Sequence, residues 1–166
     1  MHIYTDLTGL IHLIASASAL ITGTVVLVKK KGTINHKRWG YLYTMSMATV
    51  VITSFMMYNL FGGFGIFHFF ATISGLTLIG GMLPMFLKRP KHYISMHFSF
   101  MFWSVFGLYG AFMAEVLVRI PKTVISDGEI LAVFYNMVGI AVFIVMGIGY
   151  FIFSKKKKTW SSFEKG

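Results

Sequence analysis

Five long apolar runs dominate this chain, and short polar or basic segments separate them. A helix of about 20 apolar residues crosses the hydrocarbon core of a bilayer, and every run is long enough for one such crossing. The runs are too long for the strands of a membrane β-barrel, and they lack the alternation of such strands. The sequence therefore predicts an all-α integral membrane protein, a single domain over 1–166 with five transmembrane helices at about 7–28, 40–60, 65–87, 96–118 and 130–153.

Composition excludes the common soluble classes. Of the 166 residues, 56% are hydrophobic and 12% are charged, which is too few charges to cover the surface of a soluble domain of this size. The formal net charge of +10 comes from blocks between the apolar runs and not from a stripe along one polar face, so we expect no nucleic-acid partner. The absence of cysteine excludes disulfides and thiolate metal sites.

The basic residues also predict an orientation. Thirteen of the fifteen Lys and Arg residues follow the first, third and fifth runs, whereas Arg119 and Lys122 alone lie at the opposite end. Because basic loops stay in the cytoplasm, we expect the N-terminus outside and the C-terminus inside. The start of the chain lacks a basic n-region, so the first run is expected to be retained and not to be a signal peptide. For a bacterial protein, this predicts the inner membrane.

Four histidines occupy matched positions in or just before the first four runs. His12 and His68 lie near the outer ends of the first and third runs, while His36 just precedes the second run and His97 opens the fourth. Small residues follow His12 and His68 at the same offsets, at positions 15, 16 and 19 and at 71, 72 and 75. This pattern is typical of a direct repeat of two hairpins. We therefore expect a four-helix bundle in which His12 faces His68 and His36 faces His97, with the fifth helix added at the C-terminal side.

An imidazole is costly in lipid, so histidines inside a membrane indicate a function. Our leading hypothesis is one or two b-type haems, each held by two histidines from alternate helices, an arrangement that leaves no open iron position and suits electron transfer. The small residues beside the outer pair leave space for a flat macrocycle, or else they only let the helices pack closely. Lys37, Arg38 and Lys91 are the expected partners of the inner propionates. The protein would then transfer electrons within or across the membrane, alone or as a small subunit of a respiratory complex.

Two alternatives stay open. Glu115 is expected at the depth of His12 and His68, and two histidines with a glutamate form a common catalytic zinc set. This set predicts a non-haem site for zinc or another transition metal, in a protein similar to a zinc hydrolase, although Glu115 could instead pair with Arg119 at i+4. The second alternative is an accessory subunit without cofactor, in which the fifth helix docks onto partners in a membrane complex.

Two groups of residues carry a resemblance to known proteins. The first is Lys31, Gly32, Thr33, His36, Lys37, Gly40 and Tyr43, and the second is His97, Met101, Trp103, Ser104, Gly107, Leu108, Ala111, Glu115, Arg119 and Pro121. Together with His12 and His68, they resemble a family of small bacterial membrane proteins that is known only as a domain of unknown function, over about residues 7–121.

A more remote resemblance concerns the four histidines alone. One histidine on each of four consecutive helices is similar to the transmembrane di-haem cytochromes b of the ascorbate- and ferric-reductase type. This resemblance implies that His12 with His68, and His36 with His97, are axial ligands. If the second helix starts no earlier than Trp39, however, His36 lies in a loop and only the outer haem is expected.

Overall fold

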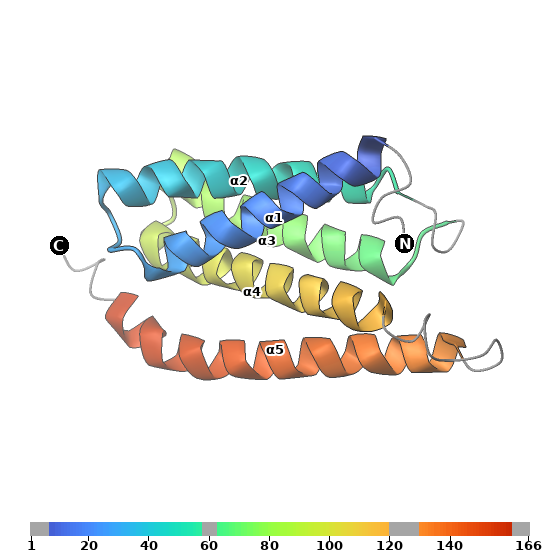
Figure 1. Ribbon diagram of the computed structural model, residues 1–166. Coiled ribbons are helices and arrows are strands. Elements are labelled where there is room, and N and C mark those ends of the chain that lie inside the picture. The colour runs from blue at the N-terminus through green and yellow to red at the C-terminus, as the bar shows by residue number, and fades with distance from the viewer. Residues whose placement is uncertain (1–6, 58–62, 120–129, 161–166) are drawn as a thin grey trace.

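The computed structural model describes residues 7–57, 63–119 and 130–160 (Figure 1). These residues form helices and no strand: α1 (Leu7–Val28), α2 (Ile34–Ser54), α3 (Ile66–Leu87), α4 (Tyr93–Arg119) and α5 (Ile130–Trp160). The all-α prediction is confirmed. Four of these helices, α1, α3, α4 and α5, contain stretches long and apolar enough to cross a membrane. The prediction of a membrane-spanning protein is confirmed to that extent.

The helix boundaries differ from the apolar runs at two places. Helix α2 begins at Ile34, well before the expected start at 40, because the Thr33 hydroxyl caps it by accepting a hydrogen bond from the His36 N–H at 3.2 Å. His36 therefore lies in the first turn of α2, and its expected position before that helix is wrong. Helix α5 continues to Trp160, so the four lysines at 155–158 are helical and do not form a separate tail.

Neighbouring helices run in opposite directions (Figure 1). Helix α2 packs against α1 and α3, α4 packs against α3 and α5, and α1 also contacts α4. Among the described helices, the backbones of α1 and α3 do not approach each other closely, and neither do those of α2 and α4. The first four helices thus follow one another around a ring, in which α2 and α4 lie opposite each other, and α5 packs outside the ring on α4.

The centre of the ring is filled by side chains from all four helices. Tyr43 of α2 is fully buried, and its hydroxyl lies 2.8 Å from the hydroxyl of Ser104 of α4, which is also fully buried. Ala15 and Ala19 of α1 belong to the same apolar core. A Cβ atom on Gly75 would lie 3.4 Å from the Val51 side chain. Among the small residues that follow His12 and His68, Ala15, Ala19 and Gly75 are thus packing positions.

Helix α5 is fixed to α4 at both ends. Val138 and Ala141 pack with Ala114 at one end. At the other end, Trp160 is 5% exposed and packs with Phe102 and Phe106 of α4. The last turn of α5 is thereby held against the start of α4.

Candidate functional site

His36 and His97 line the same cavity at the end of the molecule where α2 and α4 begin. The cavity measures about 20 Å³, and Lys31 and Trp160 also line it. The two histidines belong to opposite helices of the ring, and the Tyr43–Ser104 contact fixes how these helices face each other. His36 precedes Tyr43 by seven residues, and His97 precedes Ser104 by seven. Because seven residues make almost two helical turns, His36 lies on the same face of α2 as Tyr43, and His97 lies on the same face of α4 as Ser104.

The hydrogen bond of His97 defines its neutral tautomer. Its Nδ1 atom lies 2.8 Å from the Gly81 carbonyl oxygen. Because a carbonyl can only accept, Nδ1 carries the hydrogen and donates it, and Nε2 of the neutral ring keeps its lone pair. Histidines that bind metals commonly hold the second ring nitrogen in this way. His97 is therefore oriented and protonated as an axial ligand requires.

His36 is 8% exposed, and in the described part of the chain its Nδ1 atom has no hydrogen-bond partner. Burial lowers the pKa of His36 to about 4, and the charge of nearby Lys31 contributes to this lowering. The ring is therefore neutral at pH 7. A buried neutral imidazole with an unused nitrogen atom is costly, and this cost is recovered when the nitrogen binds a partner.

Lys31 is the cation of this site. Its Nζ atom donates to the carbonyl oxygens of Val26 and Leu27 at 2.6 and 3.1 Å, and it thereby satisfies the C-terminal end of α1. Burial and the nearby charge of Lys156 lower the pKa of Lys31 to about 8. The residues expected to meet propionates, Lys37, Arg38 and Lys91, are instead exposed and do not line the cavity.

At the opposite end, His12 binds to α2 and not to α3. Its Nδ1 atom lies 2.8 Å from the Thr53 hydroxyl oxygen. That hydroxyl donates its one hydrogen to the Thr49 carbonyl at 2.7 Å, so it accepts from His12 Nδ1–H. The carboxylate of Glu115 also acts electrostatically on the His12 ring. The hydrogen bond of His12 thus joins α1 to α2.

His68 has the opposite tautomer. Its Nδ1 atom accepts a hydrogen bond from the Gly65 N–H at 3.1 Å, which caps the start of α3. The neutral ring therefore carries its hydrogen on Nε2, the atom that an axial ligand would need to offer. The ring is also stacked on Phe64, at a centroid distance of 5.1 Å. His68 contributes to the local structure of α3 and, as it stands, does not match His12 as a second ligand.

The residues of the alternative metal site, His12, His68 and Glu115, do not form a metal-binding cluster in the described part of the chain. Within 7–57, 63–119 and 130–160, no three His, Cys, Asp or Glu side chains lie close enough to hold a metal ion. Glu115 acts electrostatically on His12, whereas His68 belongs to α3, whose backbone does not approach that of α1 closely. The side chain of Arg119 is not among those that the structure describes. Its expected pairing with Glu115 therefore stays a prediction.

The side chains that line the inner cavity could bind a haem, but the cavity is too small to hold one. Two imidazoles from opposite helices and the half-buried cation of Lys31 match the ligands and the counter-charge that haem needs. A cavity of about 20 Å³, however, has room for roughly one water molecule, while cofactor sites enclose several hundred Å³. Met101, Phe98 and Phe102 line the cavity and occupy the surrounding space.

Comparisons with protein-family models, with curated proteins and with solved structures gave no significant match. The resemblances described above stay predictions, and the function is inferred from the side chains alone.

Proposed function

We propose that this chain is an electron-transfer protein of the bacterial inner membrane that holds a b-type haem near its cytoplasmic end, between His36 and His97. One observation carries the proposal: both rings line a single cavity. The Gly81 carbonyl also holds His97 in the tautomer that offers Nε2. A haem with two imidazole ligands has no open coordination position and therefore transfers electrons rather than activating oxygen.

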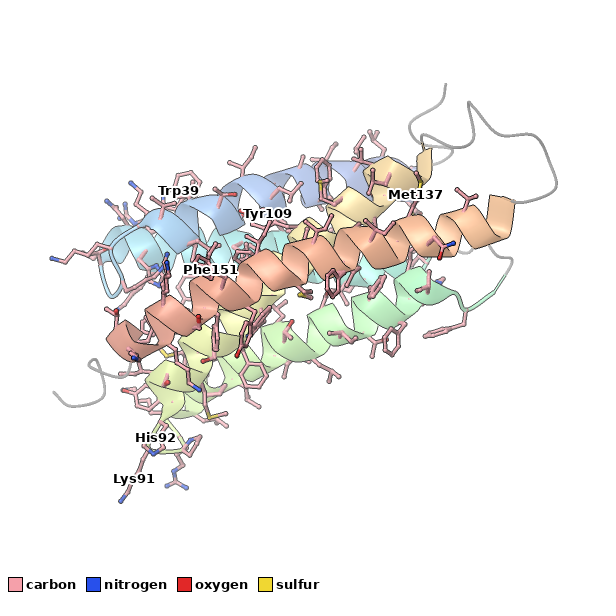
Figure 2. All side chains as sticks on the ribbon, turned by 90° about the horizontal axis from the view of Figure 1, so that it is seen from below. Trp39, Lys91, His92, Tyr109, Met137 and Phe151 are labelled. Carbon is pink, nitrogen blue, oxygen red and sulfur yellow. The ribbon has the colours of Figure 1, made fainter. Side chains whose placement is uncertain are left out.

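The arrangement of the helices supports five crossings, with α1 to α4 as the bundle and α5 added to it. Helices α1 and α3 both begin at the end opposite to the basic loops (Figure 1). The chain must therefore return through α2 between them, although α2 is less apolar than the other helices. Figure 2 shows Trp39, Lys91 and His92 at one end of the molecule, with Met137 toward the other. The basic end faces the cytoplasm by the positive-inside rule.

Loading of the group requires side chains to move. The present cavity is too small for a haem, so the proposal requires lining side chains such as Met101 and Phe102 to move. Methionine suits this role because its unbranched side chain adopts several conformations at low cost. Lys31 lines the same space and would supply a positive charge for a propionate.

The outer pair has weaker support. A second haem between His12 and His68 needs Nε2 of His68 as a ligand, and His68 would first have to release the Gly65 N–H. The sequence favours the outer haem if α2 begins after His36. Because α2 begins at Ile34, the observations favour the inner site, and we propose one haem in each chain.

The test is the absorption spectrum of the detergent-purified full chain, expressed with sufficient haem, before and after reduction by dithionite. We expect a Soret band and an α-band that sharpen on reduction. His97→Ala should abolish both bands, whereas the matched control His92→Ala, at an exposed histidine of the α3–α4 loop, should keep them.

A colourless wild-type protein would overturn the haem proposal, and metal analysis of the same sample then separates the alternatives. Stoichiometric zinc, lost in both His12→Ala and Glu115→Ala, would favour the outer metal site. A protein without metal would favour an accessory subunit, whose partners contact the exposed apolar face of α5.

A further inference from the structure

A second feature of the basic end lies outside the histidine cavity. An open groove of about 380 Å³ runs between the start of α4 and the end of α5. It is lined by Ser95 of α4 and by Ser154, Lys157 and Lys158 of α5. None of these residues lines the cavity of His36 and His97. The groove combines two ammonium groups with two hydroxyl groups and has no carboxylate among the described residues that line it.

The lysines of this groove are held in place by the fold. Trp160 follows them in the sequence and is buried, with its ring 5.8 Å from that of Phe98 and 5.7 Å from that of Phe102. The helical turn that carries Lys157 and Lys158 is therefore anchored to α4 and is not a solvated tail. A positive charge in the last turn also stabilises the end of α5. That effect alone, however, does not require a groove shared with Ser95.

The position of the groove indicates the kind of ligand. The apolar run of α5 ends at Phe153, so the groove lies where the hydrocarbon core gives way to lipid headgroups. Just before the groove, α5 exposes large apolar side chains, with Phe143 80% and Phe151 60% exposed. A ligand at this place meets cations at one end and an apolar helix face at the other.

We propose that the groove binds the phosphodiester headgroup of an anionic phospholipid, whose acyl chains lie along the exposed face of α5. The ammonium groups of Lys157 and Lys158 donate to the phosphate oxygens, and such charge-assisted hydrogen bonds are the strong ones. The hydroxyl hydrogen of Ser154 is donated to the Phe151 carbonyl at 2.9 Å, so the two lysines dominate the binding. This site is independent of the proposed haem.

The experiment is native mass spectrometry of the full chain in detergent micelles, titrated with phosphatidylglycerol or with phosphatidylcholine. A lysine near a membrane surface contributes about fivefold to the binding of an anionic lipid, so K157Q/K158Q should weaken phosphatidylglycerol binding about thirtyfold. The control K29Q/K30Q removes the same charge from two exposed lysines of the α1–α2 loop and should leave binding within about twofold. Phosphatidylcholine should bind weakly to all variants.

Three results would overturn the proposal. The first is unchanged binding in K157Q/K158Q, and the second is an equal loss in K29Q/K30Q, which would indicate diffuse attraction to the whole basic end. The third is competition by inorganic phosphate at the concentration of the lipid, which would assign the groove to a free anion. If the double variant does not purify as a folded protein, the single variants K157Q and K158Q, each expected to lose about fivefold, give the same comparison.

Discussion

The hydrogen bond between Tyr43 and Ser104 provides a quantitative test of how α2 and α4 are opposed. Both side chains are fully buried, and their hydroxyl oxygens lie 2.8 Å apart. Tyr43→Phe removes one hydroxyl and leaves that of Ser104 without this partner in an apolar core, which costs about 1–3 kcal/mol. Hydrogen bonds between membrane helices have measured coupling energies of about 0.6 kcal/mol on average and about 1.7 at most. We therefore expect Tyr43→Phe to cost about 1–2 kcal/mol and the coupling with Ser104→Ala to be about 0.5–1.7 kcal/mol.

The assay is a double-mutant cycle on the free energy of unfolding in micelles, with Tyr43→Phe, Ser104→Ala and the double variant. Tyr41→Phe is the matched control because Tyr41 lies on the same helix and is 54% exposed, and it should change stability by less than about 0.5 kcal/mol. Additive effects of the two core substitutions would refute the contact. They would also refute the opposition of the helix faces that bring His36 and His97 together.

Three further predictions concern packing, protonation and the end of α5. A Cβ atom on Gly23 would lie 3.0 Å from the Tyr43 ring, so Gly23→Ala should destabilise the fold by about 1–3 kcal/mol in the same unfolding assay. A Cβ atom on Gly40 would have no atom within 4 Å, so Gly40→Ala should stabilise the fold by about 0.5–1 kcal/mol. The pKa of His36 is about 4 in the folded protein against 6.5 in the unfolded chain, so the unfolded state binds more protons between these values and stability should fall as the pH is lowered from about 6.5 to 4. Thermal unfolding should show this slope in the wild type and less of it in His36→Gln; an equal slope in both would contradict the assignment. Trp160→Ala should release the last turn of α5, so trypsin should cleave at the preceding lysines faster than in the wild type, and unchanged cleavage would show that Trp160 does not anchor that turn.

Apolar length was sufficient to predict which segments are helical, because crossing a bilayer demands about 20 apolar residues. Apolar length did not predict where α2 starts, since His36, Lys37 and Arg38 are polar and the helix begins at a capping residue before them. Thr33 is a typical capping residue, and it was the available signal for the true boundary. Apolar length also did not predict where α5 ends, because a buried tryptophan follows four lysines that are themselves good helix formers.

The candidate site was predictable only in part. The spacing of the two hairpins predicts that His36 faces His97, and both residues line one cavity. The tautomers were not predictable, because they depend on hydrogen-bond partners brought by other helices or by turns: the Gly81 carbonyl accepts from His97, and the Gly65 N–H donates to His68. The role of Lys31 was missed because it lies in a basic loop, although its distance of four to five residues from the last carbonyls of α1 is typical of a C-terminal cap.

The most direct test of the proposed inner site is the amount of haem b per chain, measured as the pyridine haemochrome on wild-type protein and on the His36→Ala and His68→Ala variants. We predict one haem per chain in the wild type and in His68→Ala, and none in His36→Ala. Two haems in the wild type, or a full haem content in His36→Ala, would contradict a single site between His36 and His97.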